Sequence, residues 1–87
     1  MHDIYIISFN STHHAIRFEK RLKELELNIK TIPTPREITS SCGLSIMFSK
    51  DKIDIIKNNI DDMRIDYYGV FNIKKIEGGN KELTKLY

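Results

Sequence analysis

The spacing of hydrophobic and polar residues changes several times along the chain, and each change predicts a new element. Residues 4–9 form a short apolar run of β-branched and aromatic residues, which is typical of a central strand. The Asn-Ser-Thr run at 10–12 then offers side-chain oxygens that can cap a helix. The apolar residues that follow recur at helical intervals and predict a first amphipathic helix; they are Ala15, Phe18, Leu22 and Leu25.

The rest of the chain alternates between strand and helix patterns. Residues 28–33 read as a half-buried strand, which Pro33 and Pro35 end because proline donates no ladder hydrogen bond. A third strand is predicted over residues 44–48, and Ser49 can cap a second helix. The apolar stripe of that helix is Ile53, Ile56, Ile60 and Met63. A last strand is predicted from residue 66 to residue 73.

This order of elements, β-α-β-β-α-β, predicts an α+β fold. The simplest architecture for it is a ferredoxin-like two-layer sandwich, with a four-stranded antiparallel sheet and two helices on one face. We expect a single domain over residues 1–77. Gly78 and Gly79 loosen the backbone, so residues 78–87 are predicted to be a flexible or frayed C-terminal tail.

The predicted topology brings separate segments to one end of the sheet. Its first two strands run in the same direction with the third strand between them. The loops at 10–14 and 33–43 should therefore open at the same end as the beginning of the last strand, near Tyr67 and Tyr68.

The two faces of the first strand also predict assembly. Residues 4–9 are apolar on both faces, whereas the two helices can cover only one face of the sheet. We predict a homodimer or another partner on the uncovered face, with Met47 contributing to the contact. The alternative is that Lys30 or the tail covers this patch.

Composition narrows the class of protein. The 87 residues include 14 Lys and Arg against 12 Asp and Glu, and the net charge of +2 is too small and too scattered to favour a nucleic-acid partner. One cysteine excludes an intrachain disulfide and favours a reducing compartment. No signal-peptide pattern begins the sequence, and no apolar stretch approaches the roughly 18 to 20 residues of a membrane span. We expect a cytoplasmic protein with no membrane partner.

The single cysteine, Cys42, lies in the least ordinary stretch of the sequence. Small polar residues surround it, and Arg36 precedes it by six positions. A nearby cation favours the charged thiolate, which is the reactive form of cysteine. A lone cysteine is also commonly a small buried hydrophobe, so exposure of the sulfur decides between the two interpretations.

Other residues can support a reactive thiol at this position. Either His13 or His14, at the beginning of the first helix, can supply a positive or hydrogen-bonding group. Gly43 permits close approach or unusual backbone angles beside the sulfur. Ser40 and Ser41 can donate hydrogen bonds to the sulfur or cap the turn.

Two stretches, at residues 7–15 and 32–44, resemble the signature of a family of small bacterial domains, the selenium/sulfur carrier-like proteins. The resemblance covers most of residues 4–76. It implies that Cys42 is a carrier thiol that holds sulfur or selenium for transfer, and it implies two partners, a donor such as a cysteine desulfurase and an acceptor enzyme. The positions that match the motif are His13, His14, Arg36, Ser40, Ser41, Cys42 and Gly43.

Three alternatives remain open. A metal site would have at most three ligands, from Cys42, His13 and His14, and lacks the paired cysteines of structural zinc, so no metal is expected. A cysteine hydrolase needs a base and an orienting acid beyond the thiol. Glu37 can be proposed as the acid, and we expect neither stand-alone catalysis nor a cofactor. The last alternative is a non-catalytic module in which the Pro-Thr-Pro-Arg to Cys-Gly loop binds a ligand or a protein.

Overall fold

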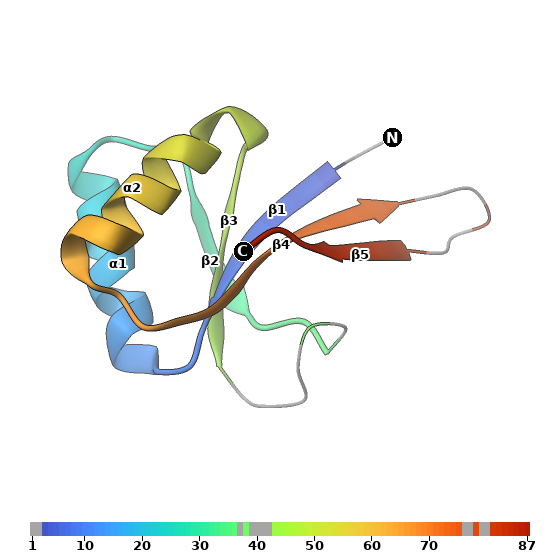
Figure 1. Cartoon of the computed structure of the whole chain (residues 1–87), viewed down its shortest axis with the longest axis horizontal. Coiled ribbons are helices and arrows are strands. Elements are labelled where there is room, and N and C mark those ends of the chain that lie inside the picture. The colour runs from blue at the N-terminus through green and yellow to red at the C-terminus, as the bar shows by residue number, and fades with distance from the viewer. Residues whose placement is uncertain (1–2, 37, 39–42, 76–77, 79–80) are drawn as a thin grey trace.

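The computed structural model describes residues 3–36, 38, 43–75, 78 and 81–87. The elements are, in chain order, β1 (Asp3–Phe9), α1 (Thr12–Glu24), β2 (Lys30–Pro33), β3 (Leu44–Phe48), the 3-10 helix η1 (Lys50–Lys52), α2 (Ile53–Met63), β4 (Tyr67–Lys75) and β5 (Lys81–Lys85). The strands form one antiparallel sheet in the order β2-β3-β1-β4-β5, and both helices lie on the same side of it (Figure 1). The fold is therefore α+β, as predicted.

The number of strands corrects the prediction. The sheet has five strands rather than four, because residues 81–85 of the expected loose tail form β5 and pair with β4. Strand pairing uses backbone groups, so an edge strand needs no apolar alternation in its own sequence. The first four strands have the predicted neighbours: β1 and β2 run in the same direction, with β3 antiparallel between them.

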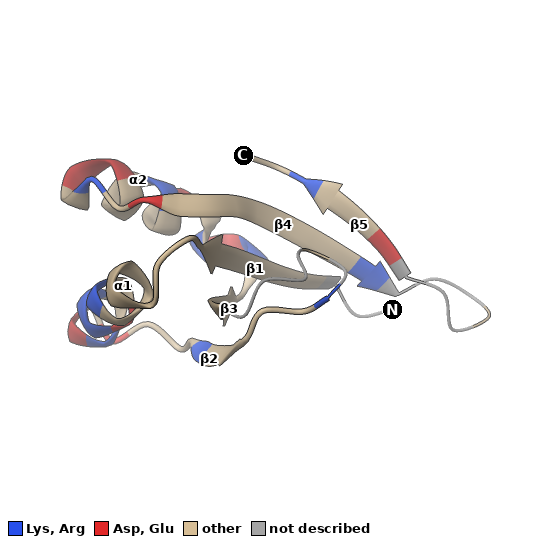
Figure 2. Ribbon diagram, turned by 90° about the horizontal axis from the view of Figure 1, so that it is seen from below, with Lys and Arg blue, Asp and Glu red and all other residues tan. Residues whose placement is uncertain are grey.

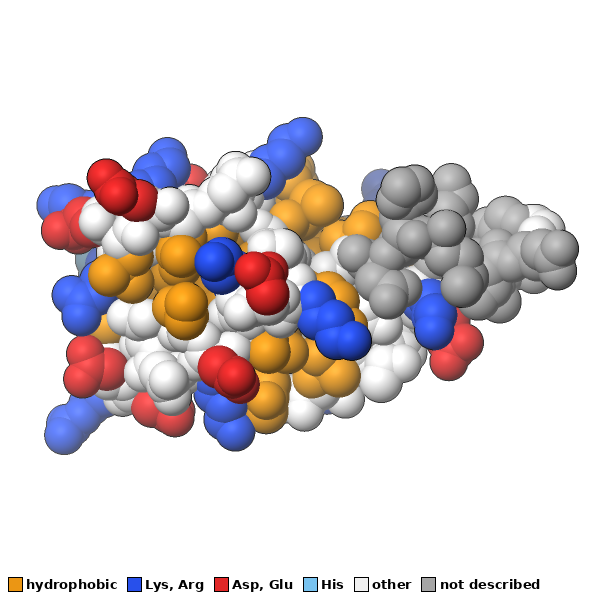
Figure 3. Space-filling view, turned by 90° about the horizontal axis from the view of Figure 1, so that it is seen from above, with side chains coloured by type: hydrophobic (Ala, Val, Ile, Leu, Met, Phe, Trp, Pro, Cys, Tyr) orange, Lys and Arg blue, Asp and Glu red, His pale blue; other side chains and the backbone are white. Residues whose placement is uncertain are grey.

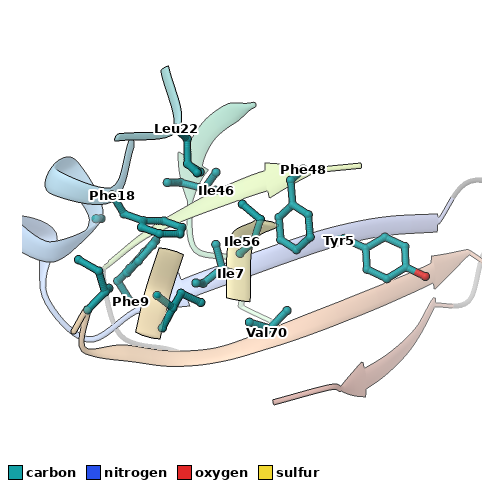
Figure 4. Packing of buried hydrophobic residues seen from close by; sticks show 12 residues of the cluster. Tyr5, Ile7, Phe9, Phe18, Leu22, Ile46, Phe48, Ile56 and Val70 are labelled. Atoms are coloured by element: carbon teal, nitrogen blue, oxygen red, sulfur yellow. The ribbon is translucent and has the colours of Figure 1, made fainter. Parts of the chain in front are cut away.

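The main core lies between the helices and the side of the sheet that faces them (Figure 4). α1 buries Ala15, Phe18 and Leu22, and α2 buries Ile56 and Ile60. The buried residues that the strands contribute to this side are Tyr5, Ile7, Phe9, Ile46, Phe48 and Val70. Each large side chain of this kind contributes about 1.5 to 3 kcal/mol when it leaves water, so this cluster is the main source of stability.

The helix boundaries differ in detail from the sequence pattern. α1 begins at Thr12 with Ser11 as its N-cap residue. It ends at Glu24, and Leu25 is the C-cap residue with 45% of its surface exposed, so the predicted stripe stops one turn early. η1, with Ser49 as its N-cap residue, precedes α2.

The opposite side of the sheet is not the bare patch that the sequence predicted. Ile6, Phe71 and Ile73 are only 2 to 6% exposed, and Ile38, from the loop between β2 and β3, packs with them. Met47 is half-buried against this second cluster. The Ile38 side chain thus joins the apolar residues of this face. Side chains of the tail lie on the face as well, because Leu83 pairs with Ile73 and Lys85 pairs with Phe71. The homodimer stays a prediction.

Charged residues of both signs alternate over the helices (Figure 2). The Arg21 guanidinium donates to the Asn59 side chain at 3.2 Å and lies 3.4 Å from the Asp62 carboxylate, so one residue links α1 to α2. On the face in Figure 3, hydrophobic side chains form separate patches between acidic and basic ones. Among the described residues, no helix combines the length and apolar character that crossing a membrane requires.

Candidate functional site

Three segments that are distant in sequence meet where β1 ends. The Phe9 carbonyl oxygen lies 3.4 Å from the position that a Cβ atom on Gly43 would occupy. Phe9 also pairs with Tyr67, and the Asn10 amide donates to the Asp66 carboxylate at 3.2 Å. The predicted meeting of these segments is confirmed for the described residues, and we call this region the loop end of the sheet.

The two histidines at the loop end have different environments. His14 is half-buried, and its Nδ1 accepts a hydrogen bond of 3.1 Å from the backbone N–H of Asp66. Because Nδ1 is the acceptor, the proton of the neutral ring is on Nε2. His13 is exposed, and its ring lies 5.9 Å from that of His14, perpendicular to it. His14 therefore connects α1 to the beginning of β4, whereas His13 faces solvent.

The loop from Thr34 to Gly43 is closed at its base. The Thr34 N–H donates to the Gly43 carbonyl oxygen at 2.9 Å, and the Ile38 N–H donates to the Pro35 carbonyl oxygen at 3.0 Å in a turn. Arg36 is exposed in this turn, whereas Ile38 packs into the second cluster. The loop is thus held at both ends and at one internal residue.

A row of three hydroxyl groups lies next to the base of this loop. The Ser45 hydroxyl is 2.8 Å from the Ser8 hydroxyl and 2.8 Å from the Thr34 hydroxyl. Ser8 and Ser45 are opposite each other on β1 and β3, and both are 0% exposed. We call Ser8, Ser45 and Thr34 the hydroxyl row.

The row approaches the predicted site at Gly43. The Thr34 Oγ1 atom lies 3.5 Å from the position that a Cβ on Gly43 would take. Side chains alternate along a strand, so Ser8 shares the face of Ile6 and the second cluster. The sequence did not predict this row, because a serine in each of two apolar strands does not show that the two are paired.

Gly43 lies next to two polar groups. A Cβ atom on Gly43 would be 3.4 Å from the Phe9 oxygen and 3.5 Å from Thr34 Oγ1, which are ordinary van der Waals distances, and its role beside the sulfur stays a prediction. Its backbone is not left-handed, because the described residues with positive φ are Glu26, Arg64 and Gly78. The structure therefore shows no unusual backbone angle at Gly43.

The remaining predicted site residues, Ser40, Ser41 and Cys42, lie outside the described residues, and their roles stay predictions. Of the partners proposed for the thiol, Arg36 and His13 are exposed and Gly43 is half-buried. Within the described part of the chain, no group of three His, Cys, Asp or Glu side chains is placed to hold a metal ion.

One comparison with known proteins finds a match. A family model with the description "Putative Se/S carrier protein-like" matches residues 4–72, a range that includes all but the first residue of β1, the strands β2 and β3, both helices and the entire loop from Thr34 to Gly43. No curated protein and no solved structure matches the chain.

Proposed function

Because the chain belongs to the Se/S carrier protein-like family, we propose that it carries a sulfur or selenium atom on Cys42 and passes it to a partner enzyme. The observation that supports this proposal is the extent of the match, which spans the cysteine-containing loop and the end of β1 that meets its base at the loop end. A carrier needs a nucleophilic atom at an accessible loop and little else, which suits a domain of 87 residues.

The described surroundings of the loop support this proposal. Arg36 is an exposed cation in the same loop, and His13 is exposed at the beginning of α1. Both groups favour a thiolate electrostatically when they are charged. The half-buried His14 is held by Asp66, so we assign it to the stability of the loop end rather than to the thiol.

The proposed loading step is a transfer between thiols. The Cys42 thiolate attacks the outer sulfur of a persulfide on the donor enzyme, the sulfur–sulfur bond to the donor breaks, and the donor cysteine leaves as a thiolate. Cys42 then holds the outer sulfur as a persulfide. Delivery repeats the exchange with a nucleophile of the acceptor enzyme, and no net oxidant or reductant is consumed in the transfer from donor to acceptor.

The architecture proposed for this task is a ferredoxin-like βαββαβ unit with β5 added beside β4. Such a unit presents its first βα loop and its β2–β3 loop at one end. A donor enzyme would then contact a single end of the domain, while the helices remain on the side of the core.

The experiment is incubation of the protein with a cysteine desulfurase and cysteine, followed by mass spectrometry of the intact chain. We expect the mass to increase by one sulfur atom, and we expect reduction with a thiol reagent to reverse the increase because a persulfide is reducible. Peptide mapping should locate the added atom on Cys42. An unmodified mass with an active desulfurase present would contradict the carrier function.

The matched control is Cys42→Ser, which retains the size of the side chain and removes its sulfur. This variant should accept no sulfur and should still bind the desulfurase, because the surrounding surface is unchanged. If the variant and the natural protein bind equally and neither accepts sulfur, the loop only docks a partner.

A further inference from the structure

β5 is one of the two edge strands of the sheet, and among the described residues no strand lies beside its outer edge. The Leu86 N–H donates to the Val70 carbonyl oxygen, so the backbone groups of Leu86 and of every second residue before it point toward β4. The backbone groups of Leu83 and Lys85 therefore point outward. An edge with unpaired N–H and C=O groups is a template for an additional strand.

The other edge strand, β2, is a poorer template. It has four residues, and the last of them, Pro33, has no N–H to donate. β5 has five residues and contains no proline. An additional strand can therefore form a longer and less interrupted ladder at β5.

Positive charge is concentrated on the hairpin that β4 and β5 form. Of the 14 Lys and Arg and the 12 Asp and Glu in the chain, residues 74–85 hold four lysines and two glutamates. The rest of the chain then holds ten of each sign, so this segment carries the entire net charge of +2. Figure 2 shows basic segments on both strands of the hairpin. A partner that the hairpin attracts is therefore acidic.

β4 places no acidic residue opposite the two lysines of β5. The register puts Lys81 opposite Lys75, and like charges at a paired position oppose pairing. Lys85 is opposite Phe71, and its ammonium lies 6.0 Å from the centre of the Tyr68 ring. Within the described part of the chain, no carboxylate forms an ion pair with Lys85. A carboxylate supplied from the outer edge would complement both positions.

We propose that the outer edge of β5 docks an extended acidic segment of a partner protein, which joins the sheet as an additional strand. Leu83 is 39% exposed between the two lysines, so an apolar residue of the segment pairs with it and a carboxylate is opposite Lys81 and Lys85. Alternate residues of a strand share a face, so the segment has an acidic, an apolar and an acidic residue at every second position. This docking does not depend on the chemistry proposed for Cys42.

The same lysines disfavour a second copy of the chain at this edge. An antiparallel pair of β5 strands about a two-fold axis at Leu83 puts Lys81 of each copy opposite Lys85 of the other. Lysine on an edge strand is a common device against pairing of this kind. An acidic segment converts the repulsion into attraction, so the lysines select the partner as well as reject a second copy.

The experiment is an NMR titration of the full chain with a peptide capped at both ends, Thr-Glu-Thr-Val-Thr-Glu-Thr. We expect the amide signals of Leu83 and Lys85 to shift and their hydrogen exchange to slow, because their outward N–H groups become bonded. A second peptide has lysine in place of both glutamates. It should bind roughly tenfold more weakly, since two attractive cross-strand pairs become repulsive.

Charge reversal on the strand tests the same pairs from the side of the protein. Lys81→Glu combined with Lys85→Glu should reverse the preference between the two peptides. The matched control combines Lys20→Glu with Lys50→Glu, two exposed lysines on α1 and η1. It changes the net charge by the same amount away from the edge, so it should keep the natural preference.

Leu83→Pro tests the backbone contribution. Proline is tolerated on an edge strand where its nitrogen faces solvent, so this variant should keep β5 paired with β4 and lose binding of the acidic peptide. Urea unfolding of each variant identifies any general loss of folding. If Leu83→Pro does not fold, the comparison of the two double lysine variants decides.

Unchanged Leu83 and Lys85 amides at millimolar acidic peptide would overturn the proposal, and so would equal binding of the two peptides. Shifts of the same amides that depend on protein concentration without peptide would assign the edge to a second copy instead. The persulfide assay measures Cys42 and not this edge. A chain that accepts sulfur but binds no peptide therefore retains the carrier function and loses this docking site.

Discussion

At the residue scale, Gly69 on β4 leaves room for a neighbouring ring on the face of the sheet opposite the helices, which we call the second face. The ring of Phe71 lies over the Gly69 backbone and is 6.0 Å from the ring of Tyr68, with which it stacks. Cε of Lys85, on β5, lies 3.2 Å from the position that a Cβ on Gly69 would take. Gly69 also pairs with Ser8, so it forms part of the buried surroundings of the hydroxyl row.

Gly69→Ala should therefore destabilise the protein. The new Cβ would lie 2.8 Å from Cζ of Phe71, and that ring is only 5% exposed in a packed cluster, so it cannot move aside freely. We expect a loss of about 1 to 3 kcal/mol in the free energy of unfolding, the usual cost of overpacking. Urea denaturation measures it.

Gly43→Ala is the control for this substitution. Its nearest contacts would be 3.4 and 3.5 Å, which are ordinary van der Waals distances, so the loss should be clearly smaller than for Gly69→Ala. Equal stabilities of the two variants would contradict this account of the second face.

The candidate site could be predicted only in part at this scale. The predicted topology placed the end of the Cys42 loop beside the end of β1, and the structure confirms this for Gly43 and Phe9. The hydroxyl row could not be predicted, because it depends on the register that places Ser8 opposite Ser45. Register is a property of the paired strands, and neither serine alone differs from an ordinary polar residue in a strand.

At the element scale, the loop from Thr34 to Gly43 is attached to the sheet at its base and at Ile38. Its ends are joined by the bond from Thr34 to Gly43, and Ile38 is 9% exposed in the second cluster. Ordering a loop costs conformational entropy, and burial of one isoleucine offsets part of that cost. Ile38 is accordingly the residue that holds the middle of the loop against the sheet.

Ile38→Ala should open this loop without unfolding the domain. Removing the buried side chain takes away a described contact between the loop and the sheet, so local opening of the loop should extend to its base and let the Thr34 amide exchange its hydrogen. Hydrogen exchange followed by NMR measures this rate. We expect protection of the Thr34 amide to fall well below that of the β1 amides.

Ile73→Ala is the control, because Ile73 lies in the same cluster on β4. Its loss should cost about 2 kcal/mol or more throughout the domain, as large-to-small core substitutions do. Thr34 and β1 amides should then lose protection together. The same pattern in Ile38→Ala would show that Ile38 has no specific role in the loop.

Most helices and strands could be predicted from the periodicity of apolar residues. The strand β5 could not be, for a physical reason. The apolar stripes of α1 and α2 and the apolar run of β1 consist of residues that the core buries, so they are visible as patterns in the sequence. β5 has one apolar residue, Leu83, which is 39% exposed, so burial leaves no pattern to detect. Its formation depends on the backbone of β4, a tertiary contact that local sequence does not encode.

At the scale of the whole molecule, the C-terminal segment completes the sheet and returns to the helices. β5 pairs with β4 from Lys81 to Lys85, and beyond it the Leu86 N–H donates to the Val70 carbonyl oxygen at 2.7 Å. The Lys57 ammonium of α2 lies 4.2 Å from the centre of the Tyr87 ring. The segment that was expected to be loose therefore connects β4 with α2.

Deleting residues 81–87 should weaken the fold and expose a new edge. If the ladder hydrogen bonds of β5 contribute about 0.5 to 1 kcal/mol each, the loss in free energy of unfolding is on the order of 3 kcal/mol. β4 would become an edge strand with unpaired backbone groups, which are a template for pairing with another chain. Urea denaturation measures the first effect, and sedimentation at matched concentrations measures the second.

Tyr87→Ala separates the two contributions of the segment, since it removes the cation–π contact and leaves β5 intact. A cation–π contact at an exposed site is worth about 0.5 to 1 kcal/mol, so this variant should be only slightly less stable than the natural chain and should sediment like it. The deletion should sediment as larger species, because only the deletion uncovers the β4 edge. A truncated protein as stable as the natural one, with unchanged sedimentation, would mean that β5 neither supports β4 nor protects its edge.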